Sequence, residues 1–172
     1  MVKIFSSIVT GFIIILISLT TNVTAQEAEA NAVSPSQEIR IKEEVKLIVE
    51  KYYRYFSANE MDKIPVETHT IPWTILGTGR TYSSAEASNE NYYTSYANIK
   101  KDNPNYARSV FTIQNICVSS PTSAIVSGFN TRKRTDNSNI SISGTVYILE
   151  LTEAGWRINS FVGKALDKII SC

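Results

Sequence analysis

Hydrophobic positions repeat with two different periods along this chain, and the change of period separates a helical part from a strand part. From residue 35 to 58 the apolar side chains recur on one face of a helix. Ser34-Pro35-Ser36-Gln37 comes first and supplies a capping serine, a proline at the first helical position and a glutamine three residues after the cap. We therefore predict a long amphipathic helix that begins after Ser34 and stops near Asn59.

Shorter elements follow this helix. Residues 61–66 predict a brief helical turn, and the apolar run 73–76, closed by two glycines, predicts a short strand. Ser83-Ser84-Ala85-Glu86 has the pattern of a second capping box. It predicts a helix that carries Tyr92 and Tyr96 on one face and ends at 102–105.

From Tyr106 onward the hydrophobic period is two. Four such runs predict antiparallel strands joined by short turns, at 110–119, 123–134, 140–151 and 156–162. Gly128 and Gly144 fall inside strands on either side of one turn, which predicts a bulge or sharp bend and a strongly curved sheet. Helices followed by an antiparallel meander define an α+β protein. A long helix laid across the concave face would leave a cone-shaped cavity as the natural ligand site.

The N-terminus predicts export. Lys3 precedes an apolar stretch at residues 4–19, and Val23-Thr24-Ala25 fits the small-residue pattern before a signal-peptidase cut. The apolar stretch is shorter than the roughly 20 residues that span a bilayer, although an uncleaved anchor is the alternative. We expect a signal peptide at 1–25, a flexible leader at 26–33, one domain at 34–172, and a secreted or periplasmic location.

Charge and composition exclude several classes of partner. Removal of residues 1–25 takes one lysine from 17 basic residues and leaves 16, against 16 acidic residues. A net charge near zero favours neither nucleic acid nor, after signal cleavage, a membrane. The basic run 132–134 lies beside a turn and is interpreted as a solvated hairpin tip.

Cysteine and histidine usage is sparse. With one histidine and two distant cysteines, we predict neither a metal site nor a cofactor. Export permits a disulfide between Cys117 and Cys172. A buried apolar Cys117 beside a free terminal thiol is the other interpretation, and both stay open.

The order of these motifs resembles the nuclear transport factor 2-like (cystatin-like) superfamily. The resemblance rests on KLIVEKYYRYF at 46–56, NEMDKI at 59–64, PWTILGTG at 72–79 and VYILELTEAGWRINSF at 146–161, and it covers about residues 37–165. It implies a cone-shaped α+β fold. It implies no single activity, because this fold serves isomerases, cyclases, dehydratases, dimerisation modules and non-catalytic binders. The PWTILG version is most similar to an uncharacterised bacterial branch.

Ketosteroid isomerase-like members of this superfamily carry an aspartate base near the first strand and place neutral hydrogen-bond donors around a developing oxyanion. The predicted strand at 73–76 holds no carboxylate here. The resemblance puts Tyr147 at about the position of one donor, and Tyr55 or Tyr52 could supply a tyrosine from the helix. His69 is interpreted as a residue on the rim of the cone, without a suitable acid partner.

A set of polar and aromatic side chains is predicted to bind a ligand, with core packing as the alternative for each aromatic and the outer sheet face as the alternative for the asparagine. These candidates are Tyr55, Trp73, Tyr96, Asn115 and Tyr147.

Three hypotheses follow. The first is non-catalytic binding of a small apolar or aromatic molecule in the cone. The second is a proton-transfer isomerase, cyclase or lyase, which needs an ionisable residue inside the cone. The third is a module that forms a homodimer through the outer sheet face.

Overall fold

The computed structural model describes residues 32–164, 168 and 170–172. The predicted signal peptide at 1–25 and residues 26–31 of the predicted leader lie outside this part of the chain. Ser34–Cys172 is one compact unit, and all that follows concerns this unit alone. Within the described residues, no helix is both long and apolar enough to cross a membrane.

The first helix of the unit, α2, spans Pro35–Ala58 and is capped at both ends as its sequence predicts. The Ser34 hydroxyl accepts a hydrogen bond from the Gln37 backbone N–H at 3.3 Å, and the Gln37 side chain accepts one from the Ser34 N–H at 3.0 Å. Asn59 ends the helix in the left-handed conformation, at φ 59°. The buried stripe of α2 is Ile41, Val45, Val49, Tyr52, Tyr53, Tyr55 and Phe56.

Two more helices follow. α3 spans Lys63–Glu67, and α4 spans Ala85–Asp102. The cap of α4 is Ser84, whose hydroxyl accepts from the Ala87 N–H at 3.2 Å, so α4 begins one residue later than the predicted capping box.

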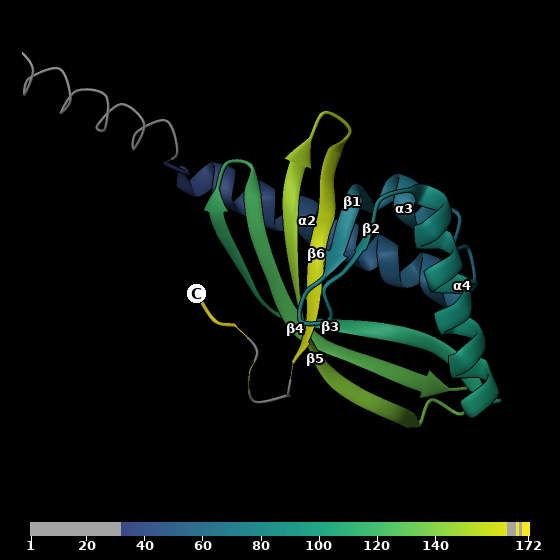
Figure 1. The fold of residues 1–172 in the computed structure, drawn as a ribbon. Helices are drawn as coiled ribbons and strands as arrows, with labels where there is room; N and C mark the ends of the chain where they lie inside the picture. Colours follow the sequence, from purple (N-terminus) through teal and green to yellow (C-terminus); the bar gives the residue numbers. More distant parts are fainter. Residues whose placement is uncertain (1–31, 165–167, 169) are drawn as a thin grey trace, which may run out of the picture. The chain divides into compact units, whose positions relative to one another are not determined.

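A six-stranded sheet completes the unit, with strand order β2-β1-β6-β5-β4-β3 (Figure 1). The strands are β1 His69–Ile75, β2 Arg80–Tyr82, β3 Tyr106–Ser120, β4 Ser123–Arg134, β5 Asn139–Thr152 and β6 Gly155–Lys164. The four predicted strands, β3 to β6, pair antiparallel as expected. β2 was not predicted, and β1 begins earlier than predicted and runs parallel to β6.

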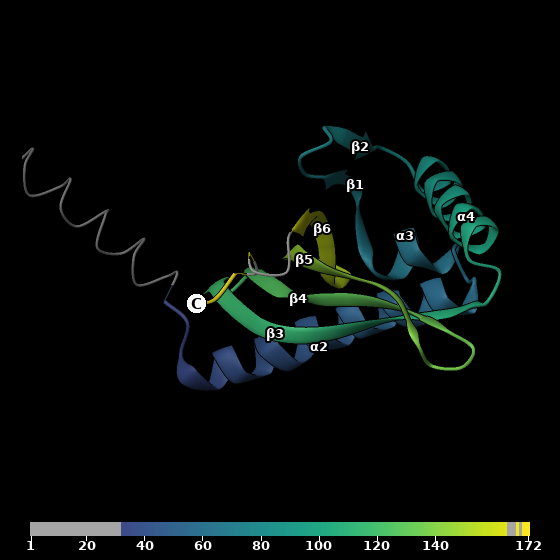
Figure 2. The same cartoon turned by 90° about the horizontal axis from the view of Figure 1, so that it is seen from below.

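The predicted bend around the interior glycines is present. Gly128 pairs with Ile113 on β3, and the register of β3 shifts immediately afterwards, between Ile113 and Asn115. A Cβ atom at Gly128 would lie 2.2 Å from the carbonyl oxygen of Thr112, so only glycine permits this approach of β3 to β4. β3 and β4 curve along their length, and α2 runs across them (Figure 2).

The two cysteines form a disulfide, Cys117–Cys172, which closes a separation of 55 residues. The hydroxyl of Ser127 also donates a hydrogen bond to the carbonyl oxygen of Ile170. The C-terminal residues are therefore fixed to β3 and β4, and the disulfide interpretation of the sequence is the correct one.

Candidate ligand-binding cavity

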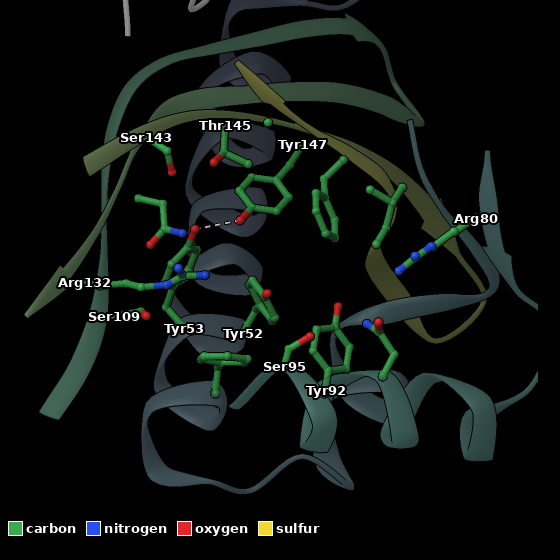
Figure 3. Close-up of a pocket in the computed structure, with 16 residues that line it drawn as sticks. Tyr52, Tyr53, Arg80, Tyr92, Ser95, Ser109, Arg132, Ser143, Thr145 and Tyr147 are labelled. Carbon is green, nitrogen blue, oxygen red and sulfur yellow. Dashed lines mark hydrogen bonds between the residues drawn. The ribbon is translucent and has the colours of Figure 1, made fainter. Parts of the chain in front are cut away.

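The cone holds a cavity of about 330 Å³ between α2, α4 and the concave face of the sheet (Figure 3). This volume is at the lower end of the range of small-molecule sites, roughly 300–1,000 Å³. The lining side chains on the helices are Tyr52, Tyr53, Phe56, Asn91, Tyr92 and Ser95. Those on the strands are Ile75, Arg80, Ser109, Asn130, Arg132, Ser143, Thr145, Tyr147 and Phe161, beside Gly163.

A pair of hydrogen-bonded tyrosine hydroxyls lies in the lining of this cavity. The hydroxyls of Tyr53 on α2 and Tyr147 on β5 are 2.7 Å apart (Figure 3). One of them donates to the other, so the proton of the accepting hydroxyl stays available to a third group. Burial raises the pKa of both phenols well above the ordinary value of 10.0, which keeps both neutral as hydrogen-bond donors.

The other polar side chains of the cavity include two cations. Figure 3 shows Arg132 from β4 and Arg80 from β2 on opposite sides of the cavity. Among the described residues, no carboxylate, imidazole, amine or thiol lines the cavity. Two polar atoms at this surface, Arg132 Nε and Asn130 Oδ1, are buried without a hydrogen-bond partner.

His69 lies in the core and not at the rim, so the sequence interpretation of its position is wrong. Its side chain is 2% exposed, and burial lowers the pKa of its imidazole to about 3, against a smaller opposing effect of the Ile64 backbone. Thr68 Oγ1 donates its proton to the Ile64 carbonyl at 2.7 Å. It must therefore accept the 2.9 Å hydrogen bond that joins it to His69 Nδ1.

This assignment fixes the tautomer of the imidazole. Nδ1 carries the proton, so Nε2 is the acceptor and the Tyr92 hydroxyl donates to it at 2.8 Å. Tyr92 lines the cavity, and the hydrogen bond to His69 in the core fixes the position of its hydroxyl. A neutral imidazole with a pKa near 3 is a poor general base.

Trp73 also lies behind the cavity wall instead of forming it. It is 1% exposed, and its indole N–H donates to the Ser88 hydroxyl at 2.9 Å. Its ring stacks on Tyr92 and on Phe161, each with 5.5 Å between ring centroids, and both of these rings line the cavity. Trp73 was predicted as a wall residue, and it supports that wall as a second layer.

Two of the predicted tyrosines face other neighbours. Tyr55 donates a 2.6 Å hydrogen bond to Glu67 of α3, which lowers the pKa of that carboxyl, and it is absent from the cavity lining. Tyr53, two residues earlier and therefore on nearly the opposite side of α2, meets Tyr147 instead. Tyr96 packs edge-on against Phe56 and lies outside the lining.

Asn115 points to the convex face of the sheet, so its prediction as a cavity residue is wrong. Simple alternation from Phe111 through Ile113 would put it inside. The bulge between Ile113 and Asn115 reverses that alternation and pairs Asn115 with Ser127. Of the five candidate residues, Tyr147 alone lines the cavity.

Some lining residues that the sequence analysis missed could have been found from the alternation of side chains along β4. Along β4, Val126, Gly128, Asn130 and Arg132 occupy alternate positions, and Val126 pairs with Tyr147 on the inner face. The same alternation therefore assigns Arg132 to the cone. The basic run 132–134 was interpreted as a solvated tip because it lies beside a turn, whereas the alternation along β4 places Arg132 on the inner face.

Helices packed on the concave face of a bent, mostly antiparallel sheet, with a cavity in the cone, define a protein of the nuclear transport factor 2-like class. A sequence model of the family described as NTF2-like protein (DUF6841) matches residues 42–165. The chain belongs to this family. No curated protein is similar enough in sequence to count as a match.

Solved structures share the same fold at low identity. A domain of unknown function with a cystatin-like fold from Nostoc punctiforme is 10% identical, with a TM-score of 0.58 over 77% of this chain and 78% of that chain. An NTF2-like protein with a cystatin-like fold from Novosphingobium aromaticivorans is 14% identical, with a TM-score of 0.54 over 86% and 90%. A ketosteroid isomerase-like protein from Erwinia carotovora atroseptica is 14% identical, with a TM-score of 0.51 over 75% and 95%. At these identities the likeness shows the fold alone.

Proposed function

We propose that this protein is exported and binds a small aromatic molecule in the cone cavity without catalysing a reaction. The observation that carries the proposal is the lining itself, in which aromatic rings surround a few hydroxyls and amides. Flat rings favour a flat ligand through stacked and edge-on contacts, and a few convergent polar groups fix its orientation. The rings are Tyr52, Tyr53, Phe56, Tyr92, Tyr147 and Phe161.

Packing between these rings supports a preformed site. Tyr53 stacks on Phe111 at 5.2 Å, and Tyr147 meets Phe111 edge-on at 5.2 Å and Phe161 at 5.7 Å. Side chains that are already locked by their neighbours lose little further freedom when a ligand binds.

A proton-transfer enzyme of the ketosteroid isomerase-like type is the second candidate. The pair Tyr53–Tyr147 favours it, because two neutral phenols 2.7 Å apart are suited to stabilise an oxyanion. The lining residues that the structure describes include no side chain that would act as a base near neutral pH, and this favours binding without catalysis. A homodimer through the convex sheet face stays a prediction.

A ligand screen followed by one matched pair of variants tests the proposal. The mature chain is screened with small planar aromatics by thermal shift, and the best ligand is titrated by calorimetry. Tyr147→Phe removes one hydroxyl from the cavity and should weaken binding about fivefold, the equivalent of ~1 kcal/mol for a neutral hydrogen bond. Tyr96→Phe removes a hydroxyl outside the cavity and should leave affinity unchanged.

Two results would count against the proposal. The first is a screen in which no planar aromatic stabilises the protein. The second is a ligand whose affinity falls equally in both variants, because that ligand would bind somewhere other than the cone. Turnover of a bound ketone, seen as solvent deuterium incorporated next to its carbonyl, would favour the enzyme instead.

A further inference from the structure

We infer that the ligand of this cavity is an aromatic carboxylate, with its carboxylate held by Arg132 and its ring held by the tyrosine and phenylalanine side chains. This inference rests on the proposed binding function and narrows it to one chemical class. Its starting point is a charge imbalance. In the part of the chain that the structure describes, Arg80 and Arg132 line the cavity and no acidic side chain does.

Arg132 is the more informative of the two cations. Within the described residues its guanidinium takes part in none of the ion pairs, all of which involve other cations. Its Nε is buried and has no hydrogen-bond partner. Arg132 as a whole is half-buried, and a partly buried cation without a counter-ion is less stable than a paired one, so proteins often pair such groups. An anionic ligand would supply the missing partner.

The charge of Arg132 acts on two tyrosines of the cavity lining. It lowers the pKa of Tyr52 and of Tyr53, in both cases against the larger raising effect of burial. Figure 3 shows Arg132 beside Tyr53 and close to the Tyr53–Tyr147 hydrogen bond. A carboxylate on the guanidinium would therefore lie within the same region as the free phenol proton of that pair.

Asn130 adds a second unpaired group at the same place. It precedes Arg132 by two residues on the inner face of β4, and its Oδ1 is buried without a partner. A half-turn of the amide exchanges its acceptor for its donor, so the side chain can serve either a carboxylate oxygen or a neighbouring ligand hydroxyl. The planar guanidinium matches the two oxygens of a carboxylate in a bidentate geometry.

The uncharged rings of the cavity favour an aromatic group as the rest of the ligand. The rings of Phe56, Tyr92 and Phe161 complete the lining and bear no charge. Since Arg80 is exposed and stands on the opposite side, it would attract an anion at the entrance, whereas Arg132 would bind it inside.

The test compares two probes of nearly equal shape, 2-naphthoate and its neutral amide 2-naphthamide. Calorimetry on the wild-type protein should show the carboxylate binding at least tenfold more tightly. Arg132→Gln should remove this preference by weakening 2-naphthoate about tenfold and changing 2-naphthamide less than twofold. Lys133→Gln removes a charge from the next residue, whose ammonium donates to Asn137 in the turn and to Asn139 at the start of β5, and should change neither affinity.

The stability of the empty protein separates a binding arginine from a structural one. Because Arg132 has no ion-pair partner among the described residues, Arg132→Gln should leave the thermal midpoint unchanged or raise it. A clearly lower midpoint would assign Arg132 a structural role and overturn the inference.

The probes also distinguish the inference from the function on which it rests. If both probes bind equally and Tyr147→Phe still weakens them, the inference of a carboxylate ligand is overturned and the proposed binding of aromatic molecules stands. Binding of neither probe to the wild-type protein would overturn the carboxylate inference, whereas only a screen in which no planar aromatic binds would overturn the proposed function.

Discussion

The buried histidine predicts a pH dependence of stability that can be worked out from the structure. His69 is the only histidine in the chain, and its pKa is about 3 in the folded protein against about 6.5 in an unfolded chain. The unfolded state therefore takes up a proton first as the pH falls. Stability is fully present above pH 6.5 and is lost as the pH falls towards 3.

The magnitude follows from the same two pKa values. Between pH 7 and pH 5 the unfolded state gains most of one proton and the folded state gains almost none, which lowers the free energy of unfolding by about 2 kcal/mol. Carboxylates contribute little in this window because they titrate mainly below pH 5. With a urea slope of about 2 kcal/mol per molar, the midpoint should fall by about 1 M.

Urea titrations followed by circular dichroism at pH 7, 6 and 5 measure this effect. His69→Gln keeps one donor and one acceptor without a titratable group, so its midpoint should vary little over the same range. Tyr92→Phe is the control, because it removes the hydrogen bond to Nε2 but leaves the imidazole. It should lower stability at every pH and keep the slope. A wild-type midpoint that is equal at pH 7 and pH 5, or a slope that survives His69→Gln, would refute the reasoning.

Three further outcomes are expected. Replacing both Cys117 and Cys172 by serine should lower stability by about 4 kcal/mol, the loop-entropy value for a 55-residue separation, as measured by urea unfolding. Gly128→Ala should cost about 1–3 kcal/mol because its Cβ would meet a β3 carbonyl, whereas Gly163→Ala, with open space around it, should be near neutral. Intact-mass measurement of exported protein should give a chain that lacks residues 1–25, cut after Ala25; a mass that includes them would contradict the export prediction.

The features that could be predicted from the sequence are those that depend on residues close together in the chain. The cap at Ser34, the stop at Asn59 and the positions of the four later strands follow from local signals, and each agrees with the structure. The bend at Gly128 was predictable because an interior glycine in a strand indicates a close approach of another backbone.

What could not be predicted depends on contacts between distant segments. His69 pairs with Ile158 through the parallel β1–β6 ladder, and no short stretch of sequence reveals that partnership or the burial it causes. The bulge after Ile113 moves Asn115 to the convex face without any glycine or proline of its own to announce it. On α2, Tyr52, Tyr53 and Tyr55 are all buried, so composition alone could not say which hydroxyl meets Tyr147.

Because Trp73 stacks on two rings that line the cavity, its fluorescence can report on the cavity. The two tryptophans of the chain have separate surroundings, because Trp73 stacks on two rings of the cavity wall, whereas Trp156 donates to Glu44 at 2.9 Å and lies outside the lining. A guest that shifts Tyr92 or Phe161 should change the emission of Trp73 and leave that of Trp156 as an internal reference. Occupancy of the cone could then be followed by intrinsic fluorescence, without a label and in real time.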